Sequence, residues 1–158
     1  AAKWYTKAAE QGNAAAQFNL ALMYDEGEGV LQDYKEAVKW YTKAAEQGNA
    51  SGQRNLGVMY EKGKGVLQDY KEAVKWHTKA AEQGNASAQN NLGFMYGNGN
   101  GVLQDNVYAH MWFNIASSNG NEMARDNRDI VAEKMTPDQL AEAQKLAREC
   151  VKKDYKNC

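Results

Sequence analysis

The chain reads GVLQDYKEAVKWYTKAAEQGN over residues 29–49, and residues 65–85 repeat this stretch with one change, Tyr41 to His77. The same offset of 36 residues runs through most of the 158-residue chain. It relates Trp4, Trp40, Trp76 and Trp112, and also Gly12, Gly48, Gly84 and Gly120. A fixed period of this length is typical of a stacked repeat array in which each unit packs on its neighbours.

Each unit carries two amphipathic helical patterns. Over residues 14–25, apolar or small side chains recur at helical spacing; they are Ala16, Leu20, Met23 and Tyr24. Over residues 34–47, a wider apolar stripe runs along one side of the predicted helix and charged residues lie on the opposite side. This pattern suits a helix packed on two flanks. The sequence therefore predicts an all-α fold of helix pairs, with short links that make neighbouring helices antiparallel.

The ends of these helices have chemical signals. Asp33 and Glu36 have the spacing of a capping box, and Gly48 is suited to the left-handed residue that ends a helix. Asn49 is then placed to cap the next helix. Between the two helices, two glycines allow a tight turn, and we expect Val30 and Leu31 to fold back onto the core.

The pattern degrades after Asn121. Arg125 replaces the glutamine of the earlier units, and Arg128 replaces their leucine. Thr136, Pro137 and Gln139 then open a last helix as N-cap, first helical residue and capping-box partner. We interpret residues 122–158 as a degenerate unit that caps the array, and we expect its last helix, from Thr136 on, to cover the helix just before it.

Charge and composition give little sign of chemistry. The net charge is −1, from 19 basic and 20 acidic residues, and no apolar run approaches a membrane span. We expect neither a nucleic-acid partner nor a membrane-spanning segment, and we expect a monomer. The two histidines, His77 and His110, fall on packed helix flanks without further ligands, so we expect no metal and no cofactor.

The repeating unit resembles the Sel1-like repeat, a relative of the tetratricopeptide repeat. The residues that carry the resemblance are Ala16, Leu20, Tyr24, Gly27, Gly29, Val30, Asp33, Ala37, Trp40, Tyr41, Ala44, Ala45 and Gly48. The resemblance implies a right-handed α/α superhelical solenoid with a role in protein–protein contacts. It divides the single predicted domain, residues 1–158, into a partial repeat at 1–13, full repeats at 14–49, 50–85 and 86–121, and the capping unit. Because Ala1 aligns with Ala37, we expect further repeat sequence before residue 1.

Two rival functions remain open beside a binding scaffold. A cysteine-rich secreted branch of the family is linked to β-lactam hydrolysis or binding, so a cell-envelope hydrolase is one alternative. That branch has a cysteine pair in every repeat, whereas this chain has two cysteines in all, and none of its serines lies in a nucleophile motif. We therefore expect no catalytic residue. The second alternative is a structural spacer within a longer array.

Cys150 and Cys158 are the only cysteines, and we predict a disulfide between them. Their Cα atoms must then lie within about 7 Å, so the last helix must end near residues 152–154 and the chain must fold back. Such a bridge favours a periplasmic or secreted protein, since cytosolic thiols stay reduced. The alternative is two free thiols, with Cys150 in the core and a cytoplasmic location.

Positions that differ between near-identical repeats indicate where a partner binds. They cluster on the first helix of each unit, and the resemblance to tetratricopeptide arrays places that face in a concave groove. The predicted groove residues are Ala15, Phe18, Leu22, Asp25, Glu26, Ser51, Arg54, Val58, Glu61, Lys62, Ser87, Asn90, Phe94 and Asn98. Apolar anchors beside an arginine suit the recognition of a protein or peptide. The alternative is that these side chains only cover the neighbouring helix.

Overall fold

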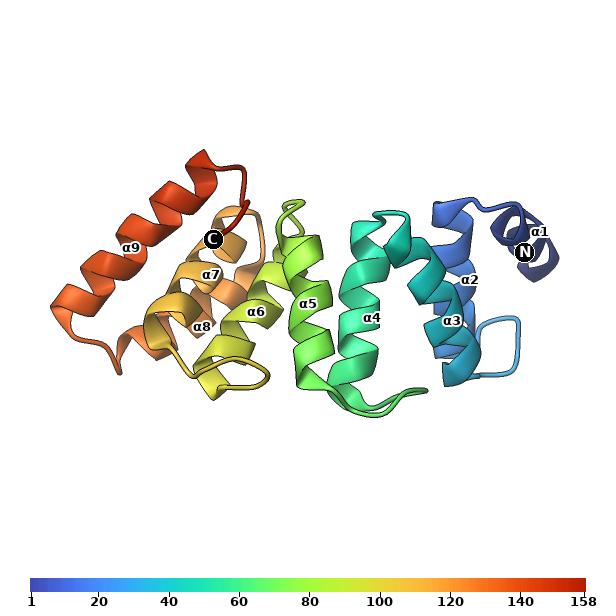
Figure 1. Cartoon of the computed structure of the whole chain (residues 1–158), viewed down its shortest axis with the longest axis horizontal. Helices are drawn as coiled ribbons and strands as arrows, with labels where there is room; N and C mark the ends of the chain where they lie inside the picture. The colour runs from blue at the N-terminus through green and yellow to red at the C-terminus, as the bar shows by residue number, and fades with distance from the viewer. The chain divides into compact units, whose positions relative to one another are not determined.

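The computed structural model describes residues 1–158 and contains nine helices and no strand, so the predicted all-α fold is confirmed (Figure 1). The helices are α1 Ala2–Glu10, α2 Ala14–Glu26, α3 Tyr34–Glu46, α4 Ala50–Lys62, α5 Tyr70–Ala81, α6 Ala86–Asn98, α7 Asn106–Ser118, α8 Glu122–Ala132 and α9 Pro137–Lys152. Their bounds follow the periodic apolar pattern to within a residue or two.

Side-chain caps start most of these helices. Asn49 Oδ1 accepts from the Gly52 amide at 2.7 Å, as predicted. Asp33 Oδ1 likewise accepts from the amides at the start of α3. The second bond of the predicted capping box, from the Asp33 amide to the Glu36 side chain, does not form, so this half of the prediction is wrong. The Asp33 amide donates instead to the Tyr24 carbonyl at 2.9 Å, and Glu36 pairs with the Lys39 ammonium at 3.0 Å.

The loop between α2 and α3 departs from one prediction. Val30 is half-buried, but Leu31 is 92% exposed and does not fold back onto the core. The loop is closed by a polar contact, because Gln32 Nε2 donates to the Asp25 carbonyl at 2.8 Å. Gly27 and Gly29 adopt positive φ angles in this turn, which leaves Leu31 at its tip.

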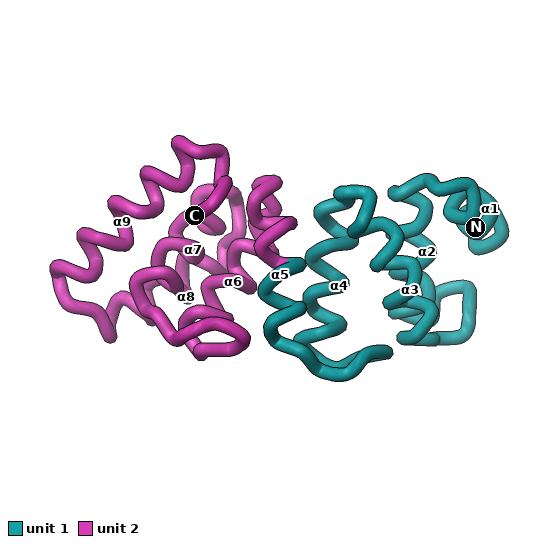
Figure 2. The backbone as a smooth tube through the Cα atoms, viewed as in Figure 1, with its two compact units in different colours: residues 1–76 teal, residues 77–158 magenta.

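The contacts divide the chain into two compact units (Figure 2). Unit 1 is Ala1–Trp76, in which α1 packs on α2, α2 on α3 and α3 on α4, around a core that includes Leu20, Tyr41 and Leu56. Unit 2 is His77–Cys158, in which α7 packs against α6, α8 and α9. The organisation of residues 1–158 as one domain stays a prediction.

A buried glutamine recurs in both units. Gln17 Nε2 donates to the Ala9 carbonyl at 3.1 Å, at the end of the preceding helix, and Gln53 and Gln89 make the same bond to Ala45 and Ala81. The side-chain oxygen is also used: Gln17 Oε1 accepts from Gln47 at 2.6 Å, and Gln89 Oε1 accepts from Asn119 at 2.9 Å. We call each such arrangement a glutamine clamp.

The last unit has no glutamine clamp. Arg125 is exposed at the glutamine position, and Arg128, at the leucine position, donates to Asn114 Oδ1 on α7 at 3.0 Å. Helix α9 packs mainly against α7 rather than against α8, whereas α3 and α7 each pack on the helix just before them. The helix that α9 covers is therefore α7 and not, as the sequence suggested, the immediately preceding one.

Beyond α9 the chain folds back, and a disulfide joins Cys150 to Cys158 with their Cα atoms 5.4 Å apart. The turn places Tyr155 at a φ of 64°, a left-handed conformation that is costly for a bulky residue. The Tyr155 hydroxyl donates to Asn119 Oδ1 at 3.1 Å, and Lys156 Nζ donates to the Glu82 carbonyl at 3.0 Å. The bridge thus holds the tail against the α5–α6 turn.

We predict that Gln89→Met, which keeps the side-chain length and removes both hydrogen bonds, lowers the free energy of unfolding by about 1–3 kcal/mol. The Ala81 carbonyl then loses its side-chain donor and keeps only the Gly84 amide, and the Asn119 amide loses its acceptor. Urea unfolding followed by circular dichroism measures this change. Gln144→Met, at an exposed position on α9, is the matched control and should leave the midpoint unchanged. Equal effects of the two substitutions would contradict the clamp.

The double substitution Cys150→Ser with Cys158→Ser should lower the free energy of unfolding by roughly 2–3 kcal/mol, as expected for a short closed loop. Unfolding of the wild type in reductant should then match that of the variant. A bridge that contributes nothing would give the same midpoint for the wild type with and without reductant.

Candidate functional site

In unit 1, the predicted groove residues of α2 border a buried polar network. The Tyr41 hydroxyl, on α3, donates to Asp25 Oδ2 at 3.2 Å and accepts from Asn55 Nδ2, on α4, at 3.0 Å. Burial raises the pKa of Tyr41 above its usual value of 10.0, and the Asp25 carboxylate raises it further, against the opposing effect of the Asn55 bond. The phenol therefore stays neutral and ties α2, α3 and α4 together.

Phe18 lies beside this network. Its ring is 6.0 Å from the ring of Tyr41 at a tilt of 41°, and it packs on the core of unit 1. Phe18 therefore belongs more to the packing of α2 on α3 than to an open surface, which is the alternative that the sequence left open.

Arg54 is partly buried on α4. Its Nη1 donates to Asn55 Oδ1 at 2.7 Å, so the guanidinium joins the Tyr41 network, whereas its Nε is buried without a hydrogen-bond partner. A buried unpaired donor costs free energy unless a ligand or solvent satisfies it. Arg54 thus has a buried donor nitrogen that its bond to Asn55 leaves unused.

In unit 2, α6 presents an exposed aromatic ring. Phe94 is 44% exposed and meets Phe113 of α7 edge to face, with ring centroids 5.2 Å apart. Beside it, Ile130 of α8 is 58% exposed. These side chains border a pocket of ≈ 160 Å³ between α6, α7 and α8, which we call the α6–α8 pocket. Its other lining residues are Gly93, Gly97, Asn98, Asn106, Asn127, Val131 and Lys134.

Asn90 requires a correction. It is only 4% exposed, because its Oδ1 accepts from Asn127 Nδ2 of α8 at 3.0 Å. Asn90 occupies the same repeat position as Phe18 and Arg54. It is therefore part of the packed interior of unit 2 and lines no open surface.

The remaining predicted groove residues differ in exposure. Those that are exposed are Ala15, Glu26, Ser51, Lys62 and Asn98, and those that are half-buried are Leu22, Asp25, Val58, Glu61 and Ser87. Of the predicted groove residues, Phe94 and Asn98 line the α6–α8 pocket. Residues of α8, which were not among the predicted groove residues, line it as well. Ile130 and Lys134 fall where the repeat degrades, so comparison between repeats could not find them.

Neither histidine is placed for chemistry at a surface. His77 and His110 are both buried, and burial, reinforced by nearby Arg128, lowers the pKa of His110. The structure contains no group of three His, Cys, Asp or Glu side chains arranged to hold a metal ion. No helix combines the length and the apolar surface that a membrane crossing requires.

Antiparallel helix pairs that recur every 36 residues define a helical repeat protein of the solenoid class. The family model of the Sel1 repeat matches residues 1–13, 14–49, 50–85 and 86–121. The chain therefore belongs to the Sel1 repeat family. No curated protein matches it.

Solved structures of bacterial proteins share the fold. A Sel1 repeat protein from Oxalobacter formigenes matches with a TM-score of 0.76 at 39% identity, over 80% of this chain and 52% of that one. A protective antigen of uropathogenic Escherichia coli with an SLR fold matches with a TM-score of 0.65 at 36% identity, over 98% and 42%. Helicobacter pylori cysteine rich protein B matches with a TM-score of 0.62 at 26% identity, over 78% and 89%. The chain thus spans about half or less of the first two.

We predict that Tyr41→Phe lowers the free energy of unfolding by about 1–3 kcal/mol at neutral pH, because Asn55 loses its acceptor. The raised pKa of Tyr41 also makes the wild type lose stability as the pH rises above 10.0, where the unfolded phenol ionises first. The Phe variant has no phenol at this position, so it should not show the loss of stability at alkaline pH that Tyr41 causes in the wild type. Denaturant unfolding at neutral and alkaline pH tests both effects.

Tyr34→Phe is the control, because the contact of Tyr34 is made by its ring, which the substitution keeps. Lys64 Nζ lies over this ring at 4.8 Å. Equal losses for the two tyrosine variants would show that the network contributes nothing specific.

Proposed function

We propose that the chain is a non-catalytic scaffold that binds a protein or peptide through the faces of its first helices, α2 and α4 in unit 1 and α6 in unit 2. Sel1 repeats commonly mediate protein–protein interaction, which gives the class of activity. The observation that carries the proposal for this chain is the α6–α8 pocket, where a large aromatic side chain stays exposed at a position that varies between repeats.

The chemistry of this pocket suits a peptide. Phe94, Phe113 and Ile130 offer an apolar contact for one side chain. Around them, the side-chain amides of Asn98, Asn106 and Asn127 supply donors and acceptors of the kind that pair with a peptide backbone. An aromatic anchor within a polar rim is the usual arrangement of a binding hot spot.

We also propose that the protein works outside the cytoplasm. The disulfide between Cys150 and Cys158 supports this location, since such bridges persist in oxidising compartments. The E. coli relative is described as a protective antigen, which is consistent with a protein that is accessible from outside the cell. Fractionation of the native host with detection of the oxidised protein tests the location, and recovery of the reduced protein in the cytosol would contradict it.

The pocket is tested by Phe94→Ser combined with Ile130→Ser. Both side chains are exposed, so the fold should persist, whereas Phe18 is a poor probe because it packs on the core. We expect at least roughly tenfold weaker capture of the native partner, because two apolar anchors are lost. The partner is identified by affinity capture from the native host and mass spectrometry, and its affinity is then measured with purified protein.

Lys39→Glu with Lys75→Glu is the control on the α3 and α5 surfaces and should leave the affinity unchanged. Equal capture by the pocket variant and the wild type would assign the partner to another surface. Capture of no protein by the wild type would favour the structural spacer over the binding scaffold.

A further inference from the structure

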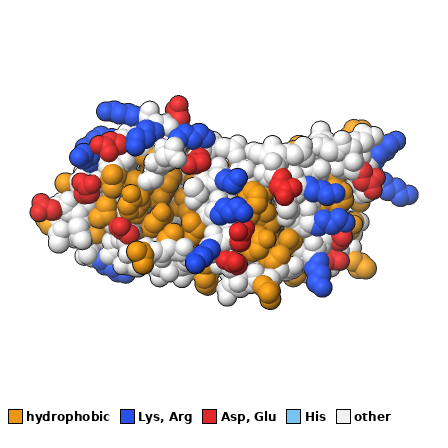
Figure 3. All heavy atoms as spheres, in the orientation of Figure 1, with side chains coloured by type: hydrophobic (Ala, Val, Ile, Leu, Met, Phe, Trp, Pro, Cys, Tyr) orange, Lys and Arg blue, Asp and Glu red, His pale blue; other side chains and the backbone are white.

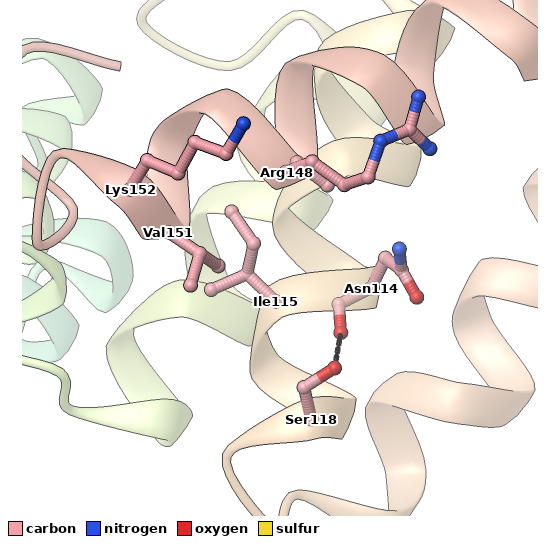
Figure 4. A pocket seen from close by; sticks show the side chains of 7 residues that line it. Asn114, Ile115, Ser118, Arg148, Val151 and Lys152 are labelled. Carbon is pink, nitrogen blue, oxygen red and sulfur yellow. Dashed lines mark hydrogen bonds between the residues drawn. The ribbon is translucent and has the colours of Figure 1, made fainter.

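A second groove lies in unit 2, between α7 and α9. It has a volume of ≈ 340 Å³ and is lined by Asn114, Ile115, Ser118, Ala147, Arg148, Val151 and Lys152 (Figure 4). None of these residues lines the α6–α8 pocket. The groove lies where α9 packs on α7, and Ile115 of α7 and the small Ala147 of α9 are part of its lining.

The floor of the groove is apolar. Ile115 and Ala147 are buried beneath it, and Val151 is 48% exposed at its edge. On the face drawn in Figure 3, hydrophobic side chains gather beside α9, and both basic and acidic side chains lie along α9. Exposed apolar surface of this kind marks a site for a ligand or partner when polar groups surround it.

The rim of the groove is cationic. Arg148 and Lys152 lie four residues apart on α9, and no carboxylate lines the groove. The structure gives neither side chain an ion pair, whereas Arg128 nearby is paired with Asp129 at 3.1 Å. Like charges at this spacing repel along a helix, and an anion bound between them would remove that cost.

The walls also have free hydrogen-bonding capacity. The Ser118 hydroxyl donates to the Asn114 carbonyl at 3.0 Å, so its oxygen can still accept. The Asn114 Oδ1 accepts from Arg128, which leaves its Nδ2 available to donate. A peptide backbone needs one donor and one acceptor of this kind.

We propose that the α7–α9 groove binds an acidic peptide segment of a partner protein, with an aliphatic side chain against Ile115 and Val151 and a carboxylate between Arg148 and Lys152. Charge complementarity selects this occupant, because the groove offers two cations and an apolar floor. The site is separate from the proposed function of the first-helix faces, and either proposal can fail without the other.

The probe is a fluorescein-labelled peptide in which leucines are flanked by aspartates, and its binding to the intact chain is measured by fluorescence anisotropy. The same peptide with asparagine for aspartate should bind roughly tenfold more weakly. Added salt should weaken binding of the acidic peptide and have little effect on the asparagine peptide. Equal affinities for the two peptides would overturn the proposal.

Two variants separate the charged rim from the apolar floor. Arg148→Glu with Lys152→Glu should weaken binding of the acidic peptide by roughly tenfold or more. Val151→Asn changes no charge and should also weaken it, which a purely electrostatic attraction would not do. The control is Lys35→Glu with Lys71→Glu, which changes the net charge equally at exposed positions in unit 1. Thermal melts by circular dichroism check that each variant is folded.

Three further results would overturn the proposal. An equal loss of affinity in the Lys35 and Lys71 control would show a general charge effect. Binding of laurate, with no binding of the acidic peptide, would make the occupant a fatty carboxylate. The chain could also self-associate in sedimentation velocity. If Arg148→Glu with Lys152→Glu abolished this self-association and the peptide did not inhibit it, the occupant would be a second copy of this chain.

Discussion

The glutamine clamp is the interaction on which each regular repeat depends. A helix cannot satisfy its own last carbonyls, and Gln17, Gln53 and Gln89 supply a buried donor to one of them. In the Gln17 and Gln89 clamps, the side-chain oxygen also accepts from a residue 30 positions later. One amide therefore fixes three consecutive helices. Partial loss of such a buried network costs more than its absence, so variation between repeats is tolerated at the surface and not at this position.

The last unit shows what happens without the clamp. With Arg125 and Arg128 in place of glutamine and leucine, α8 has neither the buried amide nor the apolar anchor that would hold a following helix against it. Helix α9 instead packs on α7. Both pockets of unit 2 that we propose as binding sites border α7, one with α8 and one with α9. Both pockets therefore lie where the regular repeat breaks down.

Local signals in the sequence were sufficient for the helices, the asparagine caps and the fold-back at Cys158, because periodicity and capping depend on residues close in the chain. Features set by distant contacts were not predictable in this way. Asn90 is buried by Asn127, 37 residues away, and α9 is placed by α7 and not by its neighbour. The clamp itself had a signal that went unused: a glutamine recurs every 36 residues within an apolar helix face. A polar residue in that position indicates a buried hydrogen bond.

The two pockets of unit 2 share α7 but open on different sides of it. Phe113 borders one and Ile115 the other, and residues two apart on a helix point roughly 160° away from each other. One bound side chain therefore cannot occupy both. Helix α8 lines the first pocket and also supports the second, since its Arg128 donates to Asn114 in the wall of the α7–α9 groove.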